Sequence, residues 1–367
     1  WGNYSKGRSS ETLDISQFVI LEDWNVGLNS IKNLDGYEIN PTVWMEDSDG
    51  EIWIGSKEGI LLKGWKHSQR LEVVKSGPLS QTVTVAHKDD NGNWWFGDSP
   101  FKRTGKFYNQ SYYNNSIVAN WNENENLWGY IKIDSDYKGS YSDIHDIESV
   151  GNILYLSSLN GLIIYDVIQN EWEILKQKDG LKDNILWDLE LFNNSLYIGT
   201  KFGISEVSIS SNSVVPNNGN WIEKFNNIEI YDIVIDSTNF YVSSSKGLYK
   251  IDHSENEIKK ISSRKFSKID FSSQNIWGLS NSLWQLDSNG GEIKYENRIS
   301  DFCIIDDFVW MTDGKEVFLS NFKSDQEFQI EIERGNKEIE IFSLNCDDEW
   351  MWLLTNNGII FYNWVSL

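Results

Sequence analysis

Aspartates recur in this sequence at a fixed distance before a repeated aromatic residue. Four lie nine residues before their aromatic and the fifth lies seven before it: Asp146, Asp188, Asp232, Asp301 and Asp270. If the repeated segments stack, the five carboxylates line a channel and could hold a cation such as Ca²⁺. Alternatively, each aspartate accepts hydrogen bonds from the backbone of an adjoining turn and fixes one repeat to the next. We favour the second interpretation, because a residue repeated along a chain usually serves the packing of the repeats, and we expect no resident metal or cofactor.

Two of the four histidines fall in the same segments as these aspartates. His87 and His145 precede consecutive aromatics, and Asp146 is adjacent to His145. A histidine pair beside a carboxylate could act as an acid-base or metal cluster, as in a polysaccharide lyase or hydrolase. Strand histidines are more often hydrogen-bonded to backbone, and no phosphate-binding loop, nucleophile elbow or His-Glu-x-x-His motif accompanies them. We therefore predict that the protein is not an enzyme, and keep His87, His145 and Asp146 as the catalytic alternative.

The elements that position these residues are repeats of about 40 residues. Residues 49–61 contain a turn with Gly50, a short strand with alternating Ile52, Trp53 and Ile54, and a second turn followed by another strand. One aromatic of the short strand, here called the anchor aromatic, marks each repeat. Eight anchor aromatics occur: Trp53, Trp95, Tyr155, Tyr197, Tyr241, Trp277, Trp310 and Trp352. This spacing is typical of four-stranded propeller blades.

Residues 46–56, with Gly59 following, resemble the two-component regulator propeller repeat. The pattern is Glu-Asp, a turn with Gly50, and then Ile52-Trp53-Ile54-Gly55-Ser56. The resemblance is strongest around Trp53, Trp95 and Tyr197. It implies a β-propeller, and it implies a role as the sensor ectodomain of a bacterial histidine-kinase hybrid or as part of a secreted or cell-envelope protein. Because the motif is structural, it implies little about a ligand.

The predicted fold is therefore all-β, a single β-propeller of eight four-stranded blades over residues 1–367, with seven blades plus an insertion as the alternative. The repeat cores lie near residues 43–65, 83–98, 144–166, 185–207, 230–251, 268–286, 299–320 and 339–364. We expect outer strands near residues 71–74, 172–175, 221–225, 257–261, 292–295 and 328–332. We expect the strand at residues 17–21 to complete the three-stranded last blade and close the ring.

The step from Trp95 to Tyr155 is longer than the others and contains an aromatic-rich insertion, residues 99–143. Aromatic faces among polar residues can stack on sugars or anchor a protein partner. The candidate ligand-binding residues are Tyr108, Tyr112, Tyr113, Trp121, Trp128 and Tyr130. The alternative, which we favour, is that they form the outer strands of the second blade and a loop packed on its neighbour.

Composition excludes some classes of function. The net charge of -23 argues against binding to nucleic acid, and no run of about 18 apolar residues could span a membrane. Cys303 and Cys346 lie in apolar segments, where we expect buried free thiols, with a bridge between neighbouring repeats as the alternative.

Taken together, these features predict a non-catalytic, extracytoplasmic recognition or scaffold module of the bacterial cell envelope, which binds a glycan or a protein partner.

Overall fold

The contacts of the chain divide it into two compact units, residues 1–77 and 78–367. The structure, a computed structural model, describes residues 18–20, 24–26, 31–33, 38–56, 61–74, 77, 83–97, 116–122, 127–132, 144–216, 221–236, 238–252, 255–272, 275–287, 290–295, 298–324, 326–330, 339–347, 349–356 and 358–364. The sequence predicts a single domain, whereas the structure has two units, and each is described by itself.

The first unit contains the repeat core of residues 43–65. Its five-stranded sheet has the order β1-β8-β7-β6-β5. The strands are β1 (Val19–Ile20), β5 (Pro41–Glu46), β6 (Glu51–Ser56), β7 (Leu61–Trp65) and β8 (Arg70–Val74). A three-stranded sheet consists of β2 (Trp24–Val26), β3 (Ile31–Asn33) and β4 (Glu38–Ile39).

The N-terminal strand joins the sheet of the first unit. β1 pairs in parallel with β8, with Val19 opposite Arg70 and Ile20 opposite Leu71. The prediction that this strand completes the C-terminal blade is therefore wrong. The alternation of buried Phe18 and Ile20 specifies a strand with one buried face, but it does not specify which sheet edge the strand joins.

The second unit contains the other seven repeat cores, each in one antiparallel sheet. The first four sheets consist of β9 (Val85–Lys88), β10 (Asn93–Gly97), β11 (Ser116–Asn122) and β12 (Leu127–Lys132); β13 (Ile144–Val150), β14 (Ile153–Ser158), β15 (Gly161–Asp166) and β16 (Glu171–Leu175); β17 (Leu186–Phe192), β18 (Ser195–Thr200), β19 (Gly203–Ser208) and β20 (Ser213–Val214); and β21 (Ile230–Ile235), β22 (Asn239–Ser244), β23 (Gly247–Asp252) and β24 (Glu257–Ser262).

The last three sheets consist of β25 (Lys268–Ser272), β26 (Asn275–Ser280), β27 (Ser282–Asp287) and β28 (Gly290–Tyr295); β29 (Asp301–Ile305), β30 (Phe308–Thr312), β31 (Val317–Asn321) and β32 (Gln326–Ile330); and β33 (Ile341–Cys346), β34 (Trp350–Thr355) and β35 (Gly358–Asn363). The described residues of the second unit also contain two 3-10 helices, η3 (Gln177–Asp179) and η4 (Trp221–Phe225). Within the described ranges, no helix has the length and apolar character that crossing a membrane requires.

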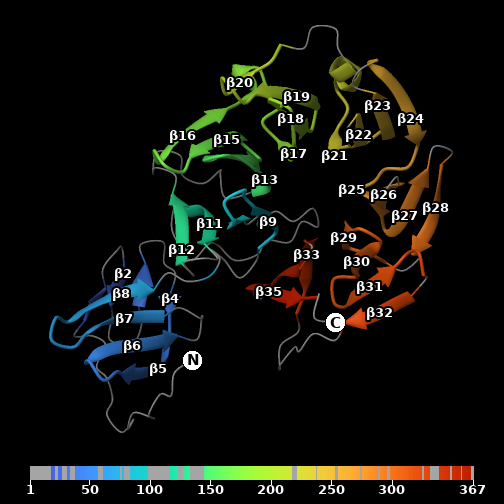
Figure 1. The fold of residues 1–367 in the computed structure, drawn as a ribbon. Coiled ribbons are helices and arrows are strands. Elements are labelled where there is room, and N and C mark those ends of the chain that lie inside the picture. The colour runs from blue at the N-terminus through green and yellow to red at the C-terminus, as the bar shows by residue number, and fades with distance from the viewer. Residues whose placement is uncertain are drawn as a thin grey trace. The chain divides into compact units, whose positions relative to one another are not determined.

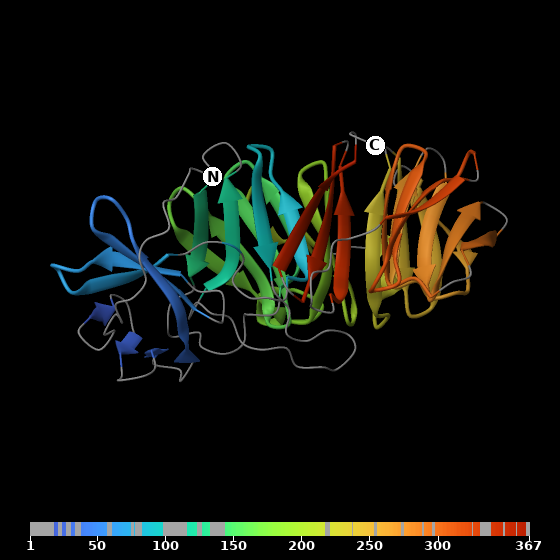
Figure 2. The same ribbon diagram turned by 90° about the horizontal axis from the view of Figure 1, so that it is seen from below.

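The seven sheets of the second unit are arranged around a common centre, as a β-propeller requires. Figure 1 shows the first strand of each sheet nearest this centre, and we call these seven the inner strands: β9, β13, β17, β21, β25, β29 and β33. Figure 2 shows that the strands of these seven sheets lie roughly along one common axis. The all-β architecture is consistent with a β-propeller.

The repeated turn after the second strand of a blade has a local cause. In the repeat core of Tyr197, Thr200 Oγ1 donates to the carbonyl of Gly203 at 2.8 Å and accepts the N–H of Phe202 at 3.1 Å. Gly203 has a φ of 137°, which an L side chain rarely adopts. Ser158 with Gly161 and Ser244 with Gly247 form the same turn. The Ser/Thr-x-x-Gly spacing therefore encodes a turn, not a site.

Apolar side chains fill the space between neighbouring sheets. Tyr155 packs in a cluster with Leu189 and Ile198 of the following sheet, and Trp277 packs with Phe302 and Val309 of the sheet after it. Tyr155 and Trp277 have no exposed surface. The anchor aromatics therefore join adjacent sheets, because each fills a wide gap between two apolar faces.

An aromatic cluster also joins the first and last sheets of the second unit. Trp94 on β10 and Trp352 on β34 have ring centroids 4.0 Å apart, and Phe96, Leu354 and Val83 complete the buried part of the cluster. Lys88 and Asp347 form an ion pair of 3.6 Å between the same two sheets. We call this contact the Trp94–Trp352 cluster.

The structure corrects one predicted outer strand. Residues 221–225 form η4, and β20 is the fourth strand of that sheet. Trp221, Ile222 and Phe225 are buried, and Trp221 packs on Tyr197 and Phe240. These apolar residues are one and three positions apart, a spacing that suits a helical turn. The segment is apolar, as expected for a packed element, but the prediction that it forms a strand is wrong.

The expectation of free thiols is also wrong. Cys303 on β29 and Cys346 on β33 form a disulfide, with Cα atoms 6.1 Å apart. Residues 43 apart in sequence become neighbours because the two inner strands lie side by side. Apolar surroundings alone therefore did not distinguish two buried thiols from a bridge between repeats.

Candidate functional site

The inner strands carry polar residues at two heights, which the strand register defines. The second inner position is the residue paired with the anchor aromatic, for example Glu148 opposite Tyr155 and Glu190 opposite Tyr197. The first inner position lies two residues earlier. From β9 to β33 it is occupied by Val85, Asp146, Asp188, Asp232, Lys268, Asp301 and Ser343.

Aspartates at the first inner position bind the backbone of the next sheet. Asp146 Oδ2 accepts the N–H of Leu189 at 2.8 Å, Asp188 Oδ2 that of Ile233 at 2.7 Å, and Asp232 Oδ2 that of Ile269 at 2.6 Å. In each case the donor follows the first inner position of the neighbouring strand. These inter-sheet hydrogen bonds match the structural interpretation of the aspartates.

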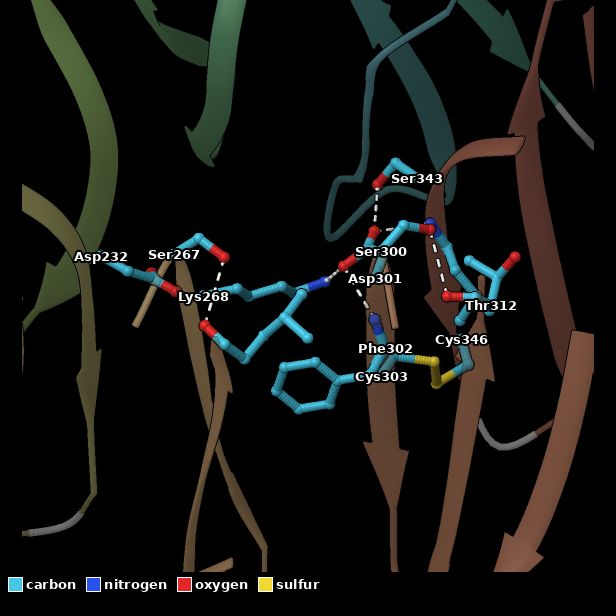
Figure 3. Close-up of polar contacts among 12 residues, drawn as sticks. Asp232, Ser267, Lys268, Ser300, Asp301, Phe302, Cys303, Thr312, Ser343 and Cys346 are labelled. Atoms are coloured by element: carbon cyan, nitrogen blue, oxygen red, sulfur yellow. Dashed lines mark hydrogen bonds and ion pairs between the residues drawn. A yellow bond between two sulfur atoms is a disulfide. The ribbon is translucent and has the colours of Figure 1, made fainter. Parts of the chain in front are cut away.

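Asp301 bonds to side chains as well as to the backbone of neighbouring strands. Its Oδ2 accepts the N–H of Leu344 and the hydroxyl of Ser343, both at 2.8 Å, while its Oδ1 accepts Lys268 Nζ at 2.8 Å. Figure 3 shows Lys268 extending toward Asp301 from one side and Ser343 approaching it from the other. Burial disfavours the ammonium of Lys268, but the Asp301 carboxylate outweighs it, and the pKa of Lys268 is raised. One aspartate thus connects three consecutive inner strands.

Asp270 does not share the height of the other four aspartates. It pairs with Trp277, which places it at the second inner position, and Lys268 occupies the first. The expectation of five aspartates at equivalent height is therefore wrong for Asp270. The residue nine positions before Trp277 is Lys268, and Asp270 lies seven positions before it. The shorter count therefore identified a residue at the second inner position instead of the first.

The second inner position has its own contacts with the next sheet. Asp270 accepts the N–H of Ile304, Glu190 that of Ile235, and His87 Nε2 lies 2.8 Å from Ser149 Oγ. The disulfide joins Cys303 and Cys346 with the same offset between strands. Between these two sheets, a covalent bond therefore makes the contact from the second inner position that a carboxylate or a histidine makes between other sheets.

Carboxyl groups are crowded on β13, β17 and β21. Burial raises the pKa of Asp146 to about 7, although two N–H donors oppose it, and burial together with Asp146 raises the pKa of Glu148 to about 8. Burial and neighbouring carboxyls raise the pKa values of Asp188 and Glu190 well above their usual range. Several of these acids therefore hold protons at neutral pH.

We expect the stability of the protein to fall as pH rises from 7 to 9. The folded pKa of Glu148 is about 8 and its unfolded value is 4.5, so the folded state alone binds this proton in that window. His87, whose pKa burial lowers from 6.5, is uncharged in both states there. Urea unfolding at both pH values should show a smaller loss for Glu148→Gln than for wild type. The exposed Glu171→Gln is the control, and equal losses in all three proteins would contradict the prediction.

A cavity of about 380 Å³ opens beside the second inner position of the first three sheets. Its lining comes from the ends of β9, β13 and β17, from the turns after β9 and β17, and from the turn after β19: His87, Lys88, Asp90, Glu148, Ser149, Val150, Leu191, Asn193, Asn194 and Ile209. Carboxyl, amide and hydroxyl groups thus face the same space as three aliphatic side chains. This combination is typical of small-molecule sites.

The structure separates the residues of the catalytic alternative. His87 lines the cavity, whereas His145 and Asp146 do not. His145 is the extra residue of a β-bulge between Ile144 and Asp146, and its ring packs edge-on against Trp187 at 4.9 Å. Asp146 Oδ1 and Oδ2 accept backbone N–H groups. The predicted three-residue cluster is therefore not assembled at one place.

The aromatic-rich insertion is partly ordinary sheet. Trp121 lies on β11 and Trp128 and Tyr130 on β12, and the rings of Trp121 and Trp128 stack at 6.3 Å. Trp128 also contacts Phe96, and Trp121 contacts Phe361, beside the Trp94–Trp352 cluster. Tyr108, Tyr112 and Tyr113 lie outside the described residues. A role of these six aromatics in ligand binding stays a prediction.

Among the cavity residues, only His87 is a candidate that the sequence identifies. Glu148 lies seven residues before Tyr155, the same spacing as Glu190 before Tyr197 and Asp270 before Trp277. Comparing that column across the repeats would have found Glu148. In the part of the chain that the structure describes, no three His, Cys, Asp or Glu side chains are grouped to hold a metal ion.

Comparisons with known proteins bear on the fold. No family model matches the chain, and no curated protein matches it. The extracellular domain of BT4673, a one-component system protein of B. thetaiotaomicron by its description, is similar with a TM-score of 0.59 and 13% identity over 91% of this chain. The chain spans 54% of that protein.

Two other solved structures are similar to parts of the chain. Virginiamycin B lyase from Staphylococcus aureus has a TM-score of 0.55 and 10% identity, covering 77% of this chain and 94% of its own. PorZ, a surface component of the type-IX secretion system of Porphyromonas gingivalis, has a TM-score of 0.55 and 11% identity, covering 78% of this chain and 38% of its own. At these identities the likenesses show the fold alone.

Proposed function

We propose that the chain is a non-catalytic, extracytoplasmic recognition module that binds an envelope protein or a glycan. We further propose that the second unit is a seven-bladed ring. The Trp94–Trp352 cluster supports closure, because it joins the first and last sheets of that unit. Seven is also the blade number of the alternative drawn from the sequence, and the repeat of residues 43–65 belongs to the first unit.

The Cys303–Cys346 disulfide supports a location outside the cytoplasm, since disulfides persist in oxidising compartments. The likeness to an extracellular domain agrees with this location. The resemblance of the repeats to sensor and cell-envelope propellers points the same way. The proposed module works without a cofactor, because the Asp146, Asp188, Asp232 and Asp301 carboxylates already accept hydrogen bonds from the next sheet.

The observation that carries the proposal is the surface around the cavity. Val150 lines the cavity and is 37% exposed, and the adjacent β15–β16 turn exposes Val167 by 38% and Ile168 by 72%. The N–H of Val167 donates to Asn152 O at 2.9 Å, which ties this turn to the β13–β14 turn. Exposed aliphatic side chains beside a polar cavity are typical of recognition surfaces.

We expect Ile168→Asp to abolish capture of a partner that wild-type protein retains. Immobilised protein would be incubated with detergent-solubilised envelope extract and, separately, with an array of envelope glycans. Phe328→Asp is the matched control, because Phe328 is 51% exposed on β32 of a different sheet. A species lost with Ile168→Asp and kept with Phe328→Asp supports the proposal. Capture that neither substitution changes would contradict it. The aromatic-rich insertion cannot be tested by deleting residues 99–143, because this deletion also removes β11 and β12.

A second candidate function, a polysaccharide lyase or hydrolase, is favoured by one observation. His87 and Glu148 line the same cavity, and a carboxyl with a pKa of about 8 can act as a general acid. Incubation with anionic polysaccharides, followed by product absorbance and reducing ends, separates the two functions. Turnover that is lost in His87→Ala but retained in His145→Ala would replace the recognition proposal by the enzymatic one.

A further inference from the structure

The charges around the cavity are unbalanced. Glu148 and Asp90 are its acidic lining residues and Lys88 is its basic one. Lys88 Nζ lies 3.6 Å from Asp347 Oδ2 and 5.2 Å from the centroid of the Trp94 ring. The ammonium of Lys88 is therefore already paired with a carboxylate of another sheet, and the two acids face the cavity with little compensation.

Further carboxyls lie behind the cavity wall. Asp146 raises the pKa of Glu148, and Glu148 in turn raises that of Glu190, so the three groups interact electrostatically. Lys268 contributes positive charge near Asp146, but its Nζ is bonded to Asp301. These acids hold protons at neutral pH, and a cation in the cavity favours release of those protons, so the groups can supply negative charge where a cation binds.

The remaining lining offers hydrogen bonds and apolar contact. Asn193 and Asn194 contribute amide groups from the β17–β18 turn. Val150, Leu191 and Ile209 contribute aliphatic walls. The volume of about 380 Å³ suits a compact molecule with a short hydrocarbon body.

We propose that this cavity binds a small molecule that carries a primary ammonium group. The Glu148 carboxylate accepts hydrogen bonds from the ammonium, and the aliphatic side chains enclose the body of the molecule. The proposal rests on the proposed recognition function and adds a small ligand in the cavity beside the recognition surface. An ammonium has three donors and a full positive charge, which match the carboxylate and the polar groups of the lining.

Binding of an ammonium is coupled to release of a proton. The groups that face Glu148 are His87, Lys88 and Asp90 from the first sheet, Asp146 on its own strand, and Glu190 from β17. An ammonium beside Glu148 lowers the pKa of this carboxyl from about 8, so binding at pH 7 expels a proton. Affinity should therefore increase between pH 6.5 and pH 8.5, where an alkylamine stays protonated.

The test is calorimetry of the full chain with n-butylamine and 1-butanol, a pair of equal length that differs in charge, at 0.15 M salt. We expect butylamine to bind with proton release, seen as a buffer-dependent enthalpy, and butanol not to bind. Glu148→Gln should weaken butylamine roughly tenfold or more, because a charge-assisted hydrogen bond is lost. Glu171→Gln, an exposed substitution with the same charge change, should leave it unchanged.

Several outcomes would overturn the proposal. They are equal binding of butanol, equal weakening by Glu171→Gln, absence of proton release, or displacement of butylamine by millimolar Ca²⁺, which would make the cavity a metal site. Circular dichroism checks that Glu148→Gln folds; if it does not, the comparison of butylamine with butanol and the proton release decide with wild-type protein alone. Partner capture that depends on Ile168, together with no binding of butylamine, would leave the proposed function intact and remove only this ligand class.

Discussion

Asp301→Ala is expected to lower the free energy of unfolding of the second unit by about 3–5 kcal/mol. The substitution leaves the partly buried Lys268 side chain, which is 31% exposed, without the carboxylate that its ammonium contacts, and it removes the acceptor of the Leu344 N–H and the Ser343 hydroxyl. Asp301 itself is only 6% exposed. Since an unpaired buried charge costs more than the pair gains, the loss should exceed that of a typical surface substitution several-fold.

Thermal unfolding followed by tryptophan fluorescence would measure this effect. A shift of roughly 10 °C is expected, by the usual relation between unfolding free energy and midpoint in a large unit. Glu327→Ala on β32 is the control, because Glu327 is exposed. The double variant Lys268→Met/Asp301→Ala should recover part of the loss, since no charge is then left unpaired. A midpoint of Asp301→Ala that matches the control would refute the assigned role.

Loss of the Cys303–Cys346 disulfide is the second large effect that we expect. The bond closes a loop of 43 residues, and the chain-entropy relation gives about 4 kcal/mol for a loop of this length. The variant Cys303→Ala/Cys346→Ala should therefore unfold roughly 10 °C below wild type. Wild-type protein that has been unfolded, reduced and refolded in reductant should behave like the variant.

Thiol titration gives an independent check of this prediction. Native protein should show no reactive thiol, and denatured, reduced protein should show two, because the sequence contains only Cys303 and Cys346. Reduction should lower the midpoint of the wild type, and reductant should leave the midpoint of the double variant unchanged. An unchanged midpoint on reduction would mean that the neighbouring inter-sheet contacts alone hold β29 and β33 together.

Much of the blade architecture could be predicted from the sequence, because it depends on local patterns. The unbroken apolar runs of residues 94–96 and 196–198 specify strands with two buried faces, and Ser/Thr-x-x-Gly specifies the turn. All eight repeat cores accordingly form sheets. The sheet that β1 joins depends on pairing with a strand that is distant in sequence. The alternation of buried and exposed side chains along β1 does not encode that partner.

The candidate site was less predictable, for a reason that Lys268 illustrates. Counting residues from the anchor aromatic located Asp146, Asp188, Asp232 and Asp301, but it assigned Asp270 to their height. Whether Asp270 or Lys268 occupies a given height depends on strand register and turn length. The cavity depends on three turns meeting in space, and residues such as Asn193 and Ile209 belong to no repeated pattern that would mark them.

The inter-sheet bonds also bear on how such repeats change over evolutionary time. The contacts of Asp146, Asp188, Asp232 and Asp301 all join inner strands. Outer strands are free of this constraint, and in one sheet the fourth strand is reduced to β20, with η4 following it. Substitutions, insertions and deletions should therefore accumulate at the periphery of each blade, while the polar column at its inner edge restricts drift.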